Sequence, residues 1–495
     1  MLFNSYIFIL AFLPICLLGY YMLRGRCATA AKVWLIAFSL WFYGYFNISY
    51  LLIMVGSVLI NYLLYRSCYR FAGHRKAVLA TGVIINLAVL FYFKYFDFFL
   101  SNVNMIFKTD IPLKNILLPL GISFFTFQQI SFLHDAYRGE MDNVGFVDYA
   151  LFVTFFPQLI AGPIVSGEDM IPQFRQAKDR RFDTDGFATG MLVFVLGLAK
   201  KVLIADTFAG AVDFGYANLA SLSSTEALLL ILFYTLQLYF DFSGYCDMAI
   251  GAGRMLGYEI AVNFNSPYKA HNIIDFWKRW HITLSRFFTK NIYIPLGGNR
   301  KGAARMYINL FLVFLLSGIW HGAGWNYILW GCMHGVLYVI TRGVERGRKN
   351  IRTMTDSGAG YRVRRIAGVL LTFAFVNAAW VFFRADSIGT ALTVFKTVGA
   401  CNFALPGEAF ADFFNLGEFW YILKVLHLTD AAFGKYILMI VFTVFSLVVV
   451  FFAPNVHEIA RKCKFSIFSG ICVGLLLVWC LVSLSGVSTF LYFNF

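Results

Sequence analysis

The fold of this chain is decided by the stretch SGIWHGAGWNYILWGCMHG, residues 317–335. It continues an apolar run that starts after Arg305, and a Gly-Ala-Gly turn (322–324) directly follows His321. The chain then returns through a second apolar run to a basic loop that begins at Arg342. The 16 residues from Arg305 to His321 give a helical rise of about 24 Å, less than the roughly 30 Å of a hydrocarbon layer. We therefore predict a helical hairpin that turns inside the membrane, with His321 at its tip.

The composition of the whole chain agrees with a membrane fold. The 495 residues are 60% hydrophobic and only 14% charged, which is more apolar surface than a soluble protein of this length can bury. We predict an all-α polytopic membrane protein with a single domain, residues 1–495, and about eleven or twelve transmembrane helices. The apolar runs that could cross the membrane are 5–23, 33–47, 48–65, 77–96, 149–165, 186–207, 227–250, 306–321, 325–341, 366–383, 436–453 and 467–489.

The stretch 116–134 is apolar but irregular. Pro119 and Gly121 interrupt its start, and two glutamines and His134 add polar groups. Irregular or polar segments at membrane depth need protein or water around them. We expect this stretch to be buried in protein, or to re-enter the membrane and return to the outer side.

Basic residues predict the orientation. With an extracytoplasmic N-terminus, and with 116–134 returning outward, the inner loops hold 31 Lys and Arg and the outer segments hold 8, while Lys200 and Lys201 fall within an apolar run. The inner loops are 24–32, 66–76, 168–185, 254–305, 342–365 and 454–465, and the outer segments are 94–115, 135–148, 208–225 and 384–435. Cytoplasmic loops carry such an excess, which explains the net charge of +15 without a nucleic-acid partner. We predict a multi-pass protein of the cytoplasmic membrane in which 384–435 folds over the extracytoplasmic surface.

Residues 237–335 hold most of the unusual composition and form the predicted catalytic region. Near its start, Asp241, Asp247 and Arg254 sit in or beside an apolar helix. Charged side chains at membrane depth are costly, so they pair or line a cavity. The plain interpretation is an internal Asp–Arg pair that braces the helix bundle.

The segment DFWKRWHITLSRFFTK, residues 275–290, has the periodicity of an amphipathic helix. At about 100° per residue, the aromatic residues and Leu284 form one stripe, away from the basic residues. We predict an interfacial helix on the cytoplasmic face, with its aromatics at the headgroup level. His281 falls at the edge between the two faces, where a structural and a functional role are both open.

His321 is the strongest candidate for chemistry, because an ionisable residue inside the membrane beside small residues is a functional candidate by default. A neutral imidazole can take the proton from a hydroxyl as it attacks a thioester or ester carbonyl. The alternative is a buried ring bonded to a carbonyl, and a structural role is expected for His334. The chain has no GxSxG, Walker or HExxH pattern, and its nine cysteines are scattered singly. Serine-hydrolase, nucleotide-hydrolase and metal-site interpretations therefore have no support.

The motif WHITLS (280–285), with a second histidine in SGIWHGAGWNYILWG forty residues after His281, resembles the membrane-bound O-acyltransferase (MBOAT) family. The resemblance is strongest to the bacterial branch of alginate O-acetyltransferases. Further segments that match this branch are LLPLGISFFTFQQISFLHDAYRG (117–139), FFPQLIAGPI (155–164), DFSGYCDMAIG (241–251), NFNSPYKAHNIIDFWKRWHITLSRFF (263–288), YIPLGGNRKG (293–302) and FLYFNF (490–495).

The resemblance implies an MBOAT fold around a central channel, with His321 as the catalytic histidine and His281 as its partner at the narrowest point. It implies that cytoplasmic acetyl-CoA is the acyl donor, with no bound cofactor. It also implies that an SGNH-type extracytoplasmic O-acetyltransferase partner passes acetyl to a polysaccharide acceptor. We further expect Trp280, Trp320 and Asn326, which neighbour the histidines in the sequence, to contact substrate.

Other functions stay open at this stage. Peptidoglycan O-acetylation or teichoic-acid D-alanylation would use the same two histidines, although LLPLGISFFTFQ favours the alginate-type branch. A transporter or flippase for an acyl carrier would also place polar residues inside a helical bundle. The paired histidines and the lack of two related halves favour the acyltransferase.

Overall fold

The computed structural model describes residues 1–141, 143–176, 182–349, 359–415, 424–425, 433–484 and 490–491. Every regular element in these ranges is helical, which confirms the predicted all-α membrane fold. Seven helices are long and apolar enough to cross a membrane: Ile48–Arg70, Arg75–Phe107, Thr184–Ala217, Ser224–Met255, Ala303–His321, Gly360–Arg384 and Gly434–Phe451. Three shorter apolar helices are Phe8–Arg24, Ile388–Gly399 and Ile467–Val482. The described ranges thus hold fewer full-length spans than the eleven or twelve predicted, because several apolar runs form short or broken helices.

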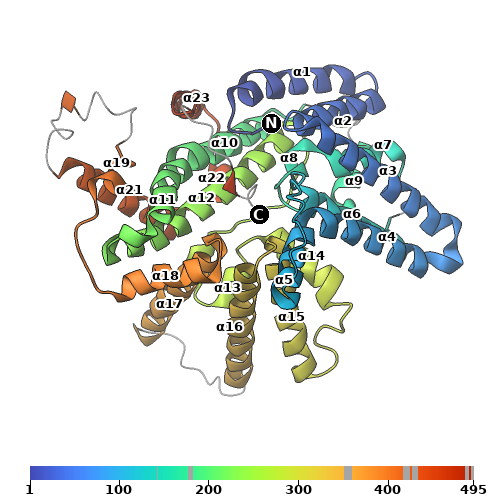
Figure 1. The fold of residues 1–495 in the computed structure, drawn as a ribbon. Helices are drawn as coiled ribbons and strands as arrows, with labels where there is room; N and C mark the ends of the chain where they lie inside the picture. The colour runs from blue at the N-terminus through green and yellow to red at the C-terminus, as the bar shows by residue number, and fades with distance from the viewer. Residues whose placement is uncertain are drawn as a thin grey trace.

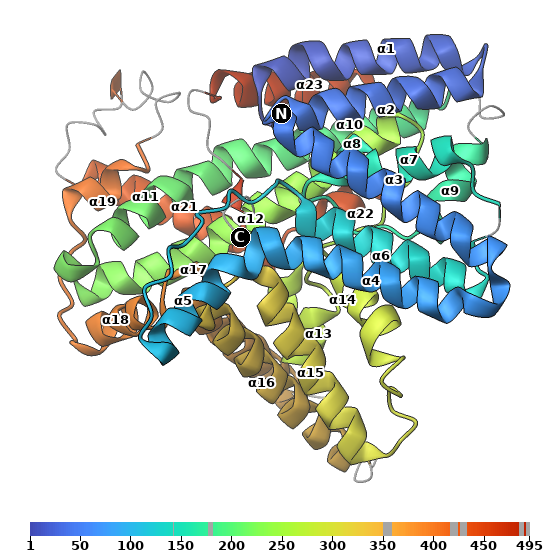
Figure 2. The same ribbon diagram turned by 45° about the vertical axis from the view of Figure 1, so that its right-hand side comes forward.

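The first half of the chain forms a group of helices that Figures 1 and 2 show in blue and green. Its α-helices are α1 (Leu13–Arg24), α2 (Ala28–Gly44), α3 (Ile48–Arg70), α4 (Arg75–Leu90), α5 (Phe96–Phe107), α6 (Ile122–Arg138), α7 (Phe146–Thr154), α8 (Phe156–Leu159), α9 (Gly167–Arg175), α10 (Thr184–Ala199), α11 (Asp206–Ala217) and α12 (Ser224–Met255). Three π-helical turns, η1 (Phe8–Phe12), η3 (Phe91–Tyr95) and η5 (Lys200–Ala205), extend or join these helices.

The second half carries the hairpin and the C-terminal helices. Its elements are α13 (Ile273–Trp277), α14 (Ile282–Phe288), the π-helical turn η8 (Thr289–Tyr293), α15 (Ala303–His321), α16 (Trp325–Lys349), α17 (Ala359–Arg384), α18 (Ile388–Gly399), α19 (Glu408–Asp412), α21 (Gly434–Phe451), α22 (Val456–Lys462) and α23 (Ile467–Val482). Short 3-10 turns are η2 (Ala72–His74), η6 (Leu219–Ser221) and η7 (Pro267–Lys269).

Helices α10 and α12 pack against each other with closely spaced backbones, and both ribbon views show them side by side. A Cβ atom on Gly190 would lie 2.8 Å from the carbonyl oxygen of Gly251, and one on Gly197 would lie 2.7 Å from that of Gly244. Such small residues let two backbones approach closely inside a membrane protein. The crossing order of the two pairs makes the helices antiparallel.

Buried ion pairs fasten the same region, and they correct the predicted Asp–Arg pair. Asp241 accepts from Lys201 at 2.6 Å, and Asp247 accepts from Lys200 at 2.7 Å. Both lysines lie in η5, where the π-helical turn directs them toward α12. Arg254 instead lies exposed at the end of α12. The pairing was missed because it joins residues about forty positions apart, across a helix packing that periodicity does not reveal.

The stretch 116–134 does not return to the outer side as one of our expectations had it. It forms most of α6, nearly all of whose side chains are buried in protein. The segment after α6 lies beside the basic loop 66–76, since the Tyr65 hydroxyl donates to the carbonyl oxygen of Met141. There, Asp148 pairs with Lys32 at 2.6 Å and with Arg175 at 3.7 Å. We call the end of the molecule that carries these loops the basic face. Segment 135–148 therefore belongs to the basic face and not to the outer segments.

The run 149–165 is not a spanning helix. It breaks at Phe155 between α7 and α8, because Pro157 has no N–H to donate to the carbonyl oxygen of Val153 four residues earlier, and its ring would clash with that carbonyl in a continuous helix. The segment enters from the basic face and turns deep in the protein, where Phe156 donates its N–H to Ser39. It then returns, so that Ile164 donates to Thr283 at 3.0 Å. The element that turns back inside the protein is therefore 149–165, and α6 begins beside this turn, since a Cβ atom on Gly121 would lie 2.9 Å from the carbonyl oxygen of Leu159.

Residues 490–491 lie at the centre of the fold, against α12. Leu491 donates its N–H to Asp241 at 3.0 Å, and the ring of Phe490 stacks on Tyr245 at 4.4 Å. In the predicted outer segment 384–435, Asn402 and Gly407 contact the start of α12, so residues 384–415 do fold over that end. Parts of six predicted features lie outside the described residues: 142, 177–181, 350–358, 416–423 with 426–432, 485–489 and 492–495.

Candidate active site

The predicted hairpin is formed by α15 and α16, which project side by side from the helical body in Figure 2. Gly318 and Gly331 make their contact possible, since a Cβ atom on Gly318 would lie 3.0 Å from the Cα of Gly331. Helix α15 ends at His321, and α16 begins at Trp325. His321 therefore lies at the tip, as its sequence position predicts.

The imidazole of His321 is buried and held in one orientation. Its Nδ1 atom lies 2.6 Å from the backbone carbonyl oxygen of Ser317, one turn earlier in α15. A carbonyl oxygen only accepts hydrogen bonds, so Nδ1 carries the hydrogen in the neutral ring and Nε2 carries the lone pair. Nε2 is consequently the nitrogen that can take a proton.

Lys94 stands against the end of the same helix. Its ammonium, from η3, donates to the carbonyl oxygens of Trp320 at 2.7 Å and His321 at 3.1 Å. The neighbouring Tyr95 hydroxyl donates to the carbonyl oxygen of Ile319 at 2.9 Å. These carbonyls belong to the last turn of α15, where no intrahelical donor is available.

His281 does not lie on a continuous interfacial helix, which corrects the prediction for 275–290. Helix α13 ends at Trp277 and α14 begins at Ile282. His281 joins them in the left-handed region at φ 45°, ψ 54°, which is uncommon for a residue with a side chain. The predicted aromatic stripe is buried in protein rather than at a headgroup boundary, and His281 itself is 0% exposed.

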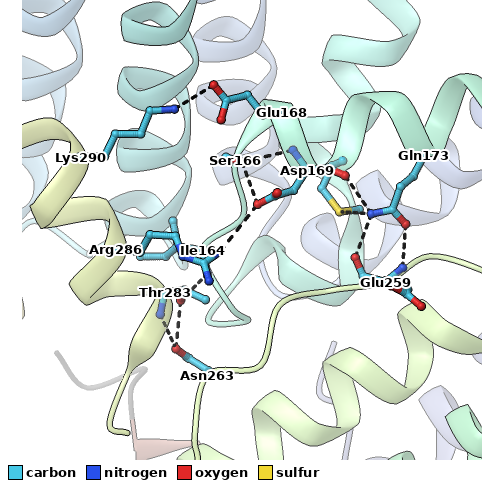
Figure 3. A network of polar contacts seen from close by, with 11 residues as sticks. Ile164, Ser166, Glu168, Asp169, Gln173, Glu259, Asn263, Thr283, Arg286 and Lys290 are labelled. Atoms are coloured by element: carbon cyan, nitrogen blue, oxygen red, sulfur yellow. Dashed lines mark hydrogen bonds and ion pairs between the residues drawn. The ribbon is translucent and has the colours of Figure 1, made fainter. Parts of the chain in front are cut away.

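Asn263 contacts both His281 and Thr283, and Figure 3 shows its contacts with Thr283. Its Oδ1 atom accepts from the backbone N–H of Thr283 at 3.2 Å and from the Thr283 hydroxyl at 3.0 Å. The Nδ1 atom of His281 lies 3.1 Å from the same oxygen. Because the Thr283 contacts identify this oxygen as an acceptor, Nδ1 of His281 donates and Nε2 carries the lone pair. Both predicted histidines thus have the same tautomer.

Trp320 lies between the two histidines. The centroid of its ring is 4.8 Å from that of His321 and 6.4 Å from that of His281. The structure therefore brings together His281, Trp320 and His321, three residues that the sequence singled out. The other side of His321 meets Trp330, with ring centroids 4.9 Å apart.

The other two predicted substrate contacts lie elsewhere in the core. Trp280 packs on Trp380, with ring centroids 5.0 Å apart. The amide of Asn326 donates to the carbonyl oxygens of Phe382 and Ala385, which ties the start of α16 to the end of α17. His334 accepts from the indole N–H of Trp277 at 3.2 Å, in line with its expected structural role. Contact of Trp280 or Asn326 with substrate stays a prediction.

Two cavities approach His321 along α15. One, of about 790 Å³, opens beside α14, η8 and the hairpin, and reaches Ser317. Lys278, Arg286 and Arg342 line it together with apolar side chains. The other, of about 480 Å³, is lined by Gly322 and Ala323 at the tip and by side chains of η3 and α5, including Lys94. We call them the basic-face cavity and the tip cavity, and His321 lies between them on the helix.

Lys290 lines the basic-face cavity, and Figure 3 shows its contact with Glu168. Its ammonium lies 2.8 Å from Asp135, 3.1 Å from Glu168 and 3.6 Å from Glu140, so the cation holds the three carboxylates together. Burial raises the pKa of the fully buried Asp135 to about 6, although Lys290 opposes this shift. Burial lowers the pKa of Lys290. The hydrogen bonds and negative charges of Asp135 and Glu168 have the larger, opposite effect, so the pKa of Lys290 is raised overall.

Two residues of the site were missed in the sequence. Lys94 was counted as an outer-loop charge, although a lysine within the apolar FYFKYF run carried the signal of an intramembrane ionisable group. Asn263 carried no such signal, because an asparagine before an Asn-Ser-Pro turn is ordinary. Only the folding of 263 against 281–283 gives it a role.

Comparisons with known proteins agree with this geometry. The sequence pattern of the membrane-bound O-acyltransferase family matches residues 35–369. The chain is 39% identical to a peptidoglycan O-acetyltransferase of Helicobacter pylori, with 100% of this chain and 98% of that protein covered. It is 39% identical to a probable alginate O-acetylase, AlgI, of Pseudomonas aeruginosa (80% and 75% covered), and 28% identical to a teichoic acid D-alanyltransferase of Bacillus subtilis (64% and 80% covered). The chain is an O-acyltransferase and belongs to the membrane-bound O-acyltransferase family.

Proposed function

We propose that this enzyme moves acetyl from acetyl-CoA on the basic face to a hydroxyl acceptor on the opposite face, for O-acetylation of an extracytoplasmic polysaccharide. The observation that carries the proposal is the position of His321 between the basic-face cavity and the tip cavity. A donor and an acceptor that enter from opposite ends would meet at one imidazole. This arrangement also supports the proposed orientation, with the basic face in the cytoplasm.

The basic-face cavity suits the donor. Lys278, Arg286 and Arg342 supply cations for the phosphates of CoA, and no acidic side chain lines it within the described residues. Apolar side chains such as Trp277 and Phe314 line its deeper part, where the pantetheine arm and acetyl group would lie. The positive-inside excess places such cations here in any case, so the support comes from their position around a cavity that reaches Ser317.

The chemistry follows from the tautomer of His321. The acceptor hydroxyl gives its proton to Nε2 as its oxygen attacks the thioester carbonyl carbon. The tetrahedral intermediate collapses, the carbon–sulfur bond breaks, and the proton on Nε2 leaves with the CoA sulfur as a thiol. The Ser317 carbonyl stabilises the imidazolium that exists between these steps by accepting from Nδ1. His281, across Trp320, is the proposed partner that orients the acetyl group or stabilises charge.

Peptidoglycan is the proposed final acceptor, because the H. pylori peptidoglycan O-acetyltransferase aligns with the whole chain. Alginate, the acceptor that the sequence motifs favoured, is the second candidate, since AlgI is equally identical over four-fifths of the chain. In either case we propose that an SGNH-type extracytoplasmic partner completes the transfer. Trp280, Trp320 and Asn326 keep their proposed role at the substrate.

The test uses oriented membrane vesicles that contain the full chain and enclose acetyl-CoA labelled in its acetyl group. We expect label to reach an external glycan acceptor, with the partner present, in the wild type but not in His321→Ala. Muropeptides and alginate oligosaccharides offered in parallel distinguish the two acceptors. The proposal would be overturned if no label reached either acceptor and the enclosed acetyl-CoA was neither hydrolysed nor used for transfer.

A further inference from the structure

We propose that Lys94 is a positioning residue of the acyl-transfer site, whose ammonium holds the end of α15 and thereby the imidazole of His321. The inference rests on the proposed function of His321 and assigns a role to a residue outside the two-histidine motif. It begins with the place of Lys94 in the chain. Lys94 lies inside the apolar helical stretch Arg75–Phe107, where a charge is costly unless it does specific work.

The local backbone explains how Lys94 reaches α15. The stretch is α-helical on both sides of η3, and the π-helical turn inserts an extra residue there. Such turns are frequent at functional sites, and they change the direction of side chains without ending the helix. Here Lys94 and Tyr95 together meet three successive carbonyl oxygens, those of residues 319, 320 and 321.

These contacts replace an ordinary helix cap. Helices commonly end in a left-handed glycine whose neighbouring N–H groups satisfy the last carbonyls. Gly322 is instead extended, at φ −162°, ψ 155°, so it forms no such cap. A cation at this end also complements the negative end of the helix dipole. The last turn of α15 therefore depends on a residue more than two hundred positions away.

The same turn of helix fixes the catalytic geometry. Ser317 and His321 bound the turn, and their hydrogen bond sets which ring nitrogen faces substrate. If the turn frays, the hydrogen bond and the position of Nε2 change together. A displacement of about 1 Å at a reacting centre can cost on the order of 10²-fold in rate. Lys94 also lines the tip cavity, but its polar contacts go to backbone carbonyls and to Ser123 at 3.5 Å.

The experiment compares Lys94→Met, which keeps the length of the side chain, with Lys94→Arg, which restores the cation and its donors. Lys114→Met is the matched control, since Lys114 lies in the same region and its ammonium stands 4.9 Å from the ring centroid of Phe96. We expect Lys94→Met to lower kcat by about 10²-fold with the KM for acetyl-CoA within about twofold. Lys94→Arg should recover at least about a tenth of wild-type kcat, and Lys114→Met should match the wild type.

Hydrogen–deuterium exchange of the peptide that covers 317–323 supplies a readout that needs no activity. Exchange should be faster in Lys94→Met than in the wild type, and unchanged in Lys114→Met. A kcat for Lys94→Met equal to that of the wild type, while His321→Ala is inactive, would overturn the proposal. If the wild type itself transfers no acetyl, the proposed function fails, and unaltered exchange in Lys94→Met would then overturn the role of Lys94 separately.

Discussion

The Nδ1 atom of His321 donates a hydrogen bond to the carbonyl oxygen of Ser317, 2.6 Å away and one helical turn earlier. Because both partners belong to α15, the helix itself selects the tautomer that leaves a lone pair on Nε2. The site therefore needs no neighbouring carboxylate to orient its imidazole. What it needs is an intact last turn of α15.

The first prediction concerns His321. His321→Ala and His321→Gln should both lower acetyl transfer by about 10²–10⁴-fold, since glutamine keeps hydrogen-bonding capacity but cannot accept and release a proton. The measurement is turnover of labelled acetyl-CoA by purified, folded protein. His271→Gln, an exposed histidine that pairs with Asp275, is the control and should keep wild-type turnover. Substantial activity in His321→Gln would rule out its role as a base.

The second prediction concerns Asn263 and His281. Asn263→Ala removes one oxygen that accepts from His281 and twice from Thr283, so it leaves buried donors without an acceptor, at about 1–3 kcal/mol each. It should lower the midpoint of thermal unfolding more than Thr283→Val does. It should also lower activity severely, as we expect of His281→Ala. Thermal unfolding in detergent measures the first effect. A midpoint for Asn263→Ala equal to that of Thr283→Val would contradict the shared-acceptor role.

The third prediction is a pH dependence of stability at the Lys290 cluster. The pKa of Asp135 is raised to about 6, so its charged form weakens the fold above that pH and protonation relieves the cost below it. Lys290→Met removes the ammonium that offsets this charge, and losing the partner of a buried charge typically costs about 3–5 kcal/mol. The drop in unfolding midpoint should therefore be large at pH 8 and small at pH 5. An equal drop in the unfolding midpoint at pH 8 and pH 5 would refute this pH dependence. The same drop in Lys278→Met, a variant at an exposed lysine, would also refute it.

The fourth prediction concerns the buried pair between Lys201 and Asp241, whose atoms lie 2.6 Å apart. Lys201→Met should destabilise the fold by about 3–5 kcal/mol, because it leaves the charge of Asp241 buried without its cation. Asp241→Asn should cost less, because Lys201 keeps its ion pair with Asp206 at 2.8 Å. The double variant should lose clearly less than the sum of the two. A parallel cycle on the exposed pair Lys435–Glu408 should show little change. Additive losses at the buried pair would show that the two side chains do not stabilise each other.

The fifth prediction uses two native cysteines as reporters of orientation. Cys27 and Cys401 are both exposed, the first on the basic face and the second near the opposite end, beside the start of α12. In intact cells an impermeant maleimide should label Cys401 but not Cys27, and in permeabilised cells it should label both. Tyr137→Cys should behave like Cys27, because 135–148 lies on the basic face. Labelling of Cys27 in intact cells would reverse the proposed orientation.

Much of the fold could be predicted because a membrane helix is specified by one continuous segment of the sequence. A long apolar run must form a helix in lipid, where each backbone group needs an internal partner. The tip position of His321 followed from the Gly-Ala-Gly turn directly after it, although the structure makes α15 long enough to cross a membrane, contrary to the length argument. Periodicity was less reliable where the segment was buried in protein: 275–290 reads as one helix, but it bends at His281 because both of its sides pack against protein.

The sequence by itself determined the membrane class, the helical hairpin and the two histidines, because hydrophobic length, turn residues and rare polar groups are properties of short segments. Only the tertiary structure decided that 149–165 turns back inside the protein and that Lys200 and Lys201 rather than Arg254 pair with the aspartates. It also decided that Asn263 contacts His281 and that Lys94 contacts the end of α15. The physical reason is that a buried hydrogen bond or ion pair takes its partner from whichever helix packs beside it. That neighbour lies about forty positions away for Lys201 and more than two hundred for Lys94.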